Sequence, residues 1–82
     1  MKITLKLYAS LEKYLPHNAS KNQAIIEIKD GLDVERTLDK CGIPLDQRHM
    51  VMLNGVHIKP EERAARGLSE LDSLAVWPPS TG

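Results

Sequence analysis

The dipeptide Asn54-Gly55 constrains the fold of this chain more than any other feature, because it separates two short runs in which apolar residues alternate with others. Both central residues of a type I′ turn need positive φ, which Asn and Gly adopt readily, so the pattern predicts a β-hairpin. Four side chains of this hairpin are predicted to face the core: Val51, Leu53, Val56 and Ile58. Three are predicted to share the opposite face: Met50, Met52 and His57.

Length and charge narrow the possible classes of protein. The chain has 82 residues, enough for one small domain, and its 11 Lys and Arg balance 11 Asp and Glu. A neutral chain lacks the basic excess typical of nucleic-acid binders and of polybasic membrane-surface proteins. The first residues alternate and contain no signal-peptide core, and a single cysteine cannot form an internal disulfide. We therefore expect a cytoplasmic protein with no nucleic-acid or membrane partner.

Three further segments have clear periodicity. Residues 2–8 and 73–77 alternate with period two, as half-buried strands do, and a further strand is predicted over 23–29. Asp33 is a good N-cap for a helix, and Gly42 stands where a helix ends. The order strand, strand, helix, hairpin, strand predicts an α+β fold. We expect a β-grasp, or ubiquitin-like, roll: a mixed sheet of four to five strands with one main helix on one face.

Several residue types that often carry chemistry are interpreted here as structural. Cys41 lies on the apolar stripe of the predicted helix, without the positive surroundings that favour a thiolate, and is predicted to pack in the core. The three histidines are scattered and do not predict a metal site. Four charged residues are predicted to form a solvated surface: Glu61, Glu62, Arg63 and Arg66. Leu68 and Leu71 are predicted to point inward from a turn.

The sheet face away from the helix is the predicted docking surface. If the hairpin and the last strand lie beside one another, four apolar side chains share that face: Met50, Met52, Ala75 and Trp77. We call these four residues the apolar patch. Exposed apolar patches of this kind mark interaction surfaces. The alternative is that the segment 60–72 folds over part of the patch.

The chain resembles the MoaD/ThiS family of ubiquitin-like sulfur carriers. The resemblance rests on residues 7–11 (Leu-Tyr-Ala-Ser-Leu), on the hairpin 51–58 and on the end of the chain, residues 71–82. Together with the order of elements it covers nearly the whole sequence. The Pro-Pro pair and the overall length are more similar to the small subunit of molybdopterin synthase than to the thiamine sulfur carrier.

The resemblance implies a carrier protein rather than an enzyme. In such carriers an E1-like adenylyltransferase uses ATP to adenylate the terminal carboxylate, here that of Gly82. A sulfur donor then displaces AMP, and the resulting thiocarboxylate passes its sulfur to an acceptor subunit of the molybdopterin synthase or thiazole synthase type. The chain itself is expected to bind no cofactor and no metal.

The resemblance also divides the chain into a β-grasp domain, residues 1–77, and a flexible tail, residues 78–82. Pro78 and Pro79 favour an extended conformation that projects the five residues roughly 15 Å. Ser80 and Thr81 are small, and Gly82 allows close approach of its backbone, which suits a narrow channel.

The family pattern ends in Gly-Gly, whereas this sequence ends in Thr81-Gly82. A further glycine follows in the full protein, or one glycine suffices, or carrier activity has been lost. The second class of function is a ubiquitin-like interaction module or protein modifier without sulfur chemistry.

Overall fold

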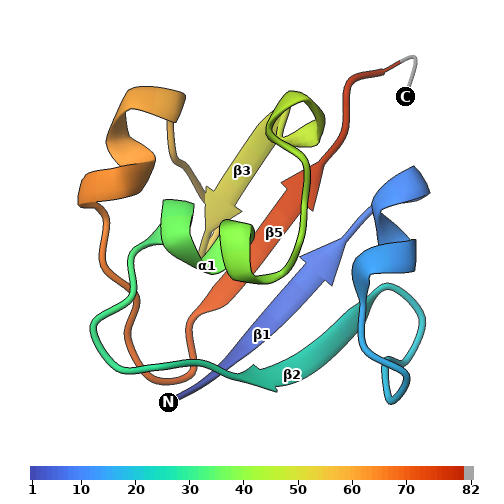
Figure 1. The fold of residues 1–82 in the computed structure, drawn as a ribbon, viewed down its shortest axis with the longest axis horizontal. Helices are drawn as coiled ribbons and strands as arrows, with labels where there is room; N and C mark the ends of the chain where they lie inside the picture. The colour runs from blue at the N-terminus through green and yellow to red at the C-terminus, as the bar shows by residue number, and fades with distance from the viewer. Residues whose placement is uncertain (81–82) are drawn as a thin grey trace.

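A computed structural model describes residues 1–80 of the chain. Its five strands form one sheet in the order β2-β1-β5-β3-β4, and the helix α1 lies over one face of it (Figure 1). The strands are β1 (Lys2–Leu7), β2 (Gln23–Glu27), β3 (Met50–Leu53), β4 (Val56–His57) and β5 (Ser73–Trp77). The helix α1 spans Val34–Lys40, and three short 3-10 helices are η1 (Ala9–Tyr14), η2 (Leu45–Gln47) and η3 (Pro60–Ala65). The predicted roll of one helix on a mixed sheet is confirmed.

The first and last strands lie side by side at the centre of the sheet. They run parallel, with Leu5 beside Leu74 and Leu7 beside Val76, and every other strand pair is antiparallel. Because side chains alternate between faces, the leucines and valines of these strands point toward α1. Val34 and Leu38 of the helix complete a core in which these residues are almost fully buried.

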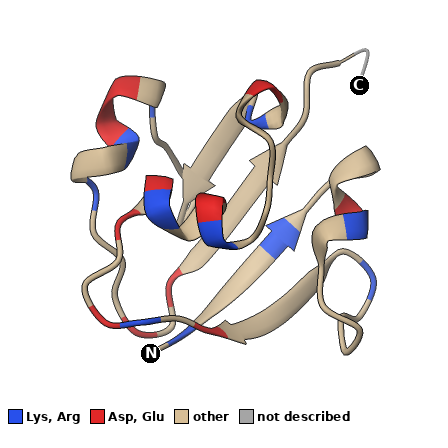
Figure 2. Cartoon of the chain, in the orientation of Figure 1, with Lys and Arg blue, Asp and Glu red and all other residues tan. Residues whose placement is uncertain are grey.

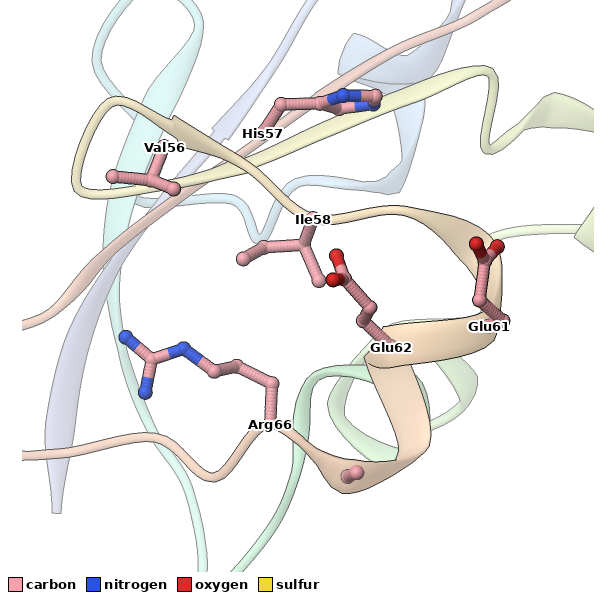
Figure 3. A pocket seen from close by; sticks show the side chains of 7 residues that line it. Val56, His57, Ile58, Glu61, Glu62 and Arg66 are labelled. Carbon is pink, nitrogen blue, oxygen red and sulfur yellow. The ribbon is translucent and has the colours of Figure 1, made fainter.

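The hairpin turns as predicted, but one of its core assignments is wrong. Asn54 and Gly55 have φ of 51° and 81°, and Leu53 pairs with Val56 across the turn. Val56 is nevertheless 61% exposed. It belongs to a short strand at the edge of the sheet, where η3 stands away from β4 and leaves an open pocket of about 440 Å³ between them (Figure 3). Ile58, on the same pocket wall, is buried as predicted.

Local capping chemistry fixes both ends of α1. The Asp33 carboxylate accepts a hydrogen bond of 2.8 Å from the backbone N–H of Arg36, the expected N-cap contact. Gly42 has φ of 80° just beyond the helix, and its N–H bonds to the carbonyl oxygen of Asp39. These contacts confirm the helix boundaries that Asp33 and Gly42 predict.

The segment between β4 and β5 departs from prediction at two residues. Leu68 is buried, but Leu71 is 77% exposed. Leu71 has φ of 69° in a turn where its N–H bonds to the carbonyl oxygen of Lys2, and this conformation leaves the side chain outside. Arg63 is only 4% exposed, so its assignment to a solvated surface is wrong, whereas Glu61, Glu62 and Arg66 are exposed as predicted.

Arg63 is buried because its guanidinium satisfies backbone carbonyls of neighbouring connections. It donates to the carbonyl oxygens of Ile58 and Arg48, both at 3.1 Å. Arg48 is itself buried and donates to the carbonyl oxygen of Ile43 and, at 2.8 Å, to the carboxylate of Asp39. The two arginines therefore join η3, the start of β3 and the end of α1.

Candidate functional site

The apolar patch lies across the two strands β3 and β5. Met50 pairs with Trp77 and Met52 with Ala75, so the four side chains share one face of the sheet, the face opposite α1. Met50, Met52 and Trp77 are half-buried in the free domain. Neither strand contains a charged residue (Figure 2). The strand pairing thus brings the predicted residues together.

Tyr8 belongs to the same surface, although the sequence-based interpretation did not include it. Its ring stacks on that of Trp77, with ring centroids 4.3 Å apart and planes inclined by 4°. The backbone of Tyr8 continues β1 in an extended conformation, and its N–H bonds to the carbonyl oxygen of Val76. Alternation after Leu7, together with the adjacent first and last strands that a β-grasp roll implies, was the signal that could have found it.

Ala75 contributes less surface than predicted. It is 8% exposed, because its strand neighbours on either side are Lys6 and Met52, whose longer side chains flank it. A partner would therefore touch chiefly Met50, Met52, Tyr8 and Trp77, with the half-buried Lys6 beside them. Lys6 adds a positive charge at one border of this surface, and the exposed His57, which pairs with Met52, adds an imidazole at the other.

The segment 60–72 lies on the other side of the sheet over much of its length. The N–H of Val34 bonds to the carbonyl oxygen of Arg66, and the N–H of Leu68 bonds to that of Leu32. Both contacts tie the segment to the entrance of α1, on the helix side of the molecule. The three large patch side chains consequently keep part of their surface open to water.

The residues that follow β5 become progressively exposed. Pro78 is buried, Pro79 is half-buried and Ser80 is exposed, and this stretch leads away from the end of β5 (Figure 1). The domain therefore still covers Pro78, the first residue after β5 ends at Trp77, and the division into residues 1–77 and 78–82 stays a prediction. Thr81 and Gly82 lie outside the described residues, so the flexibility of the tail stays a prediction.

The other candidate groups have environments that can be described individually. Cys41 is half-buried against the core, and burial raises the pKa of its thiol, as expected for a packing residue. His17, His49 and His57 are exposed. Residues 1–80 contain no cluster of three His, Cys, Asp or Glu side chains arranged to hold a metal ion. Within the same residues, no helix has the length and apolar character needed to cross a membrane.

A parallel pairing of first and last strands, a hairpin at the sheet edge and one helix across the face define the β-grasp class of ubiquitin-like proteins. The sequence agrees with this class, because residues 1–81 match the family model described as Mut7-C ubiquitin. The chain belongs to the Mut7-C ubiquitin family.

Comparison with solved structures identifies the same fold. The chain is similar to SAMP1 from Haloferax volcanii in its crystal structure, with a TM-score of 0.67 and 21% sequence identity. The match covers 100% of this chain and 99% of SAMP1. No curated protein matches the sequence. The predicted ubiquitin-like family and its β-grasp fold are thus confirmed.

Proposed function

We propose that this protein is a sulfur carrier of the cytoplasm, acting as a substrate and subunit of partner enzymes rather than as an enzyme itself. Its reactive group is the carboxylate of Gly82, at the end of the tail formed by residues 78–82. The partners are an E1-like adenylyltransferase and an acceptor subunit of a cofactor synthase, most similar to the molybdopterin type, with the thiazole type as the second possibility.

One observation carries this proposal: residues 78–80 lead away from the end of β5, the central strand of the sheet, beside the apolar patch. Trp77 ends β5 and stacks on Tyr8, and Ser80, three residues later, is exposed. A partner seated on the patch would therefore stand next to the point where the tail leaves. Pro79 at this point cannot donate a hydrogen bond to a strand, which favours an extended tail over continued pairing.

The chemistry assigns separate tasks to the two proteins. A carboxylate is a poor electrophile, so a carboxylate oxygen of Gly82 attacks the α-phosphorus of ATP in the partner's site and pyrophosphate leaves. Sulfide (HS⁻) delivered by the donor then attacks the carbonyl carbon of the acyl-adenylate, AMP leaves with the bonding electron pair, and loss of the sulfur-bound proton gives the thiocarboxylate. The carrier supplies the carboxylate, its thin tail and a docking surface, while ATP is bound and used by the partner.

The alternative function uses the same first step. If the activated carbonyl is attacked by the amine of a lysine on another protein, AMP leaves and an isopeptide bond forms, which makes the chain a protein modifier. The fold shared with SAMP1 fits either outcome, and the order of residues in the tail does not separate them. The two functions therefore differ in the nucleophile that receives the acyl group, which is sulfur in a carrier and a lysine amine in a modifier.

Adenylation is tested by ATP–pyrophosphate exchange. The intact mass of the protein isolated from its own cells first establishes its terminal residue. The protein is then incubated with an E1-like adenylyltransferase from the same cells, ATP and labelled pyrophosphate. We expect exchange that depends on the carrier, is lost when the terminal glycine is removed and is unaffected by Glu61→Gln on η3. Exchange at the level of the enzyme alone would reject the proposal.

A further inference from the structure

A second surface, distinct from the apolar patch, lies along the outer edge of β2. This strand forms one border of the sheet, beside the loop that leads to α1 (Figure 1). It is five residues long and contains neither proline nor glycine, whereas β4 at the opposite border has two residues and is soon followed by Pro60. Long edge strands without such protection are templates for pairing with another strand.

The hydrogen-bond pattern shows which main-chain groups of β2 are available. Asn22 accepts from Leu7 and Ile28 donates to Met1, so by alternation the even-numbered residues of this strand direct their N–H and C=O groups toward β1. The odd-numbered residues direct theirs outward. Gln23 already uses both groups with Ser20. Ile25 and Glu27 therefore present outward-facing N–H and C=O groups at the edge.

Each side of this edge presents apolar side chains, with Glu27, Lys29 and Lys40 among the residues that line the pocket. On the helix side, Ile26, Ile28, Leu32 and Cys41 line an open pocket of about 320 Å³ between β2 and α1. Thr37 lines it too, and its buried hydroxyl has no hydrogen-bond partner among the described residues. On the other side, Ile25 is 65% exposed. An added strand would therefore bury apolar side chains on both of its faces.

The charges around the pocket favour acidic residues at the two ends of the added strand. Lys29 and Lys40 stand at the rim, and their side chains form no salt bridge within the described residues. The neighbouring carboxylates of Glu27 and Asp30 both lie against the Met1 ammonium, at 3.0 and 3.1 Å. These two carboxylates share one ammonium, so together with the two lysines the group keeps one net positive charge, which is complementary to acidic residues.

We propose that β2 is a docking edge for an extended segment of a partner protein, a short run of β-branched aliphatic residues flanked by Asp or Glu. The segment adds to the sheet as a further strand, with main-chain hydrogen bonds to Ile25 and Glu27. Its alternate side chains enter the pocket beside α1 and cover Ile25. Strand addition of this kind derives affinity from the main chain and specificity from such pockets. This site needs neither the tail nor the apolar patch.

A synthetic peptide of sequence Asp-Val-Ile-Val-Ile-Glu-Glu, acetylated and amidated, tests the docking edge by amide chemical-shift titration of the full chain. We expect the largest shifts at Ile25, Glu27 and the pocket residues. The double substitution Lys29→Glu with Lys40→Glu should weaken binding by about tenfold and favour a peptide with lysine flanks. A dispersed spectrum of that variant excludes unfolding as the cause.

Two N-methylated peptides then test strand pairing itself. The first peptide carries N-methyl groups on every second amide, and the second peptide carries them on the remaining amides. Because alternate amides of a strand point to opposite sides, only one of the two peptides has its methyl groups directed at β2. We expect one of these peptides to lose binding and the other to keep it. The proposal is overturned if the parent peptide does not bind, if both methylated peptides bind equally, or if the shifts fall on Met52 and Trp77 or beside β4. Because no ATP is used, these outcomes are independent of the sulfur-carrier proposal.

Discussion

The indole ring of Trp77 stacks on the phenol ring of Tyr8 with their centroids 4.3 Å apart. Trp77 is the last residue of β5 and Tyr8 follows the last residue of β1, so the stack joins the ends of the two central strands. Offset-stacked aromatic pairs contribute about 0.5–1.5 kcal/mol beyond the area that they bury. The stack therefore holds the side of the apolar patch nearest to the tail in a defined position.

The patch is tested by Met52→Ser and Trp77→Ser, each measured for binding to the activating enzyme by calorimetry. Central apolar and aromatic contacts in an interface are typically worth about 2 kcal/mol or more, so we expect affinity to fall by at least about thirtyfold. Val56→Ser is the matched control, because Val56 is also exposed and apolar but lies off the patch. Unchanged affinity in both patch variants, with native circular dichroism, would contradict this role.

The buried guanidinium of Arg63 is predicted to stabilise the domain. Arg63→Met leaves the carbonyl oxygens of Ile58 and Arg48 without their donor, and each buried unsatisfied group costs about 1–3 kcal/mol. We expect the free energy of unfolding in urea to fall by about 2–4 kcal/mol. Arg66→Met, at an exposed neighbouring position, should change it by less than about 0.5 kcal/mol. Equal effects of the two substitutions would refute the structural role of Arg63.

A substitution in the hairpin turn would change the backbone strain without causing a steric clash. A Cβ at Gly55 would meet no atom within 4 Å, but the φ of 81° disfavours any L-residue. Gly55→Ala should therefore lower the free energy of unfolding by about 1–2 kcal/mol. At Gly67 a Cβ also meets nothing, and φ lies outside the left-handed region. Gly67→Ala should leave stability unchanged or slightly raise it; a loss as large as that at Gly55 would disprove the strain argument.

The cap of α1 makes stability depend on pH in the acid range. Burial acts to raise the pKa of Asp33, but hydrogen bonds from the backbone and guanidinium of Arg36, and the Arg36 charge, outweigh it and hold the pKa below 3.8. A carboxyl whose pKa is lower in the folded state stabilises the fold above its unfolded pKa. That stabilisation is lost as pH falls through the folded pKa.

Asp33→Asn tests this dependence because it keeps a capping side chain and removes the charge. Unfolding free energies of the two proteins should differ most above pH 3.8, the ordinary pKa of this carboxyl, and converge as the pH falls below it. Asp33→Ala should cost about 1 kcal/mol at neutral pH, the usual value of an N-cap. A difference between wild type and Asp33→Asn that stays constant over this range would contradict the account.

Local sequence signals predicted most of the fold. The Asn54-Gly55 turn, the Asp33 cap and the Gly42 stop depend on backbone conformations that a few adjacent residues determine, and all three are confirmed. Alternation assigned the faces of β3 and β5 correctly and so assembled the apolar patch. These features need no knowledge of distant contacts.

The predictions were wrong or incomplete where segments distant in the sequence determine whether a side chain is buried. The alternation of the hairpin predicts that Val56 faces the core, but η3 does not cover this side chain. The position of η3 cannot be read from the alternation of the strands. Arg63 was assigned to the surface because its partners, the carbonyl oxygens of Ile58 and Arg48, belong to other connections of the chain. The burial of Arg48, for which no prediction was made, likewise depends on the distant carbonyl oxygen of Ile43. Tyr8 could join the patch only once β1 was paired with β5. The predicted reactive residue, Gly82, lies outside the described residues and depends on the family resemblance.

The intact mass of the chain tests the sulfur-carrier proposal most directly. The protein is incubated with its E1-like enzyme, ATP and a sulfur donor, alongside a variant that lacks the terminal glycine. We predict that one oxygen of the wild-type chain is replaced by sulfur, that alkylation with iodoacetamide marks the C-terminal peptide in addition to Cys41, and that the variant is unchanged. An unmodified wild-type chain, or one joined to lysine of another protein through an isopeptide bond, would contradict the proposal.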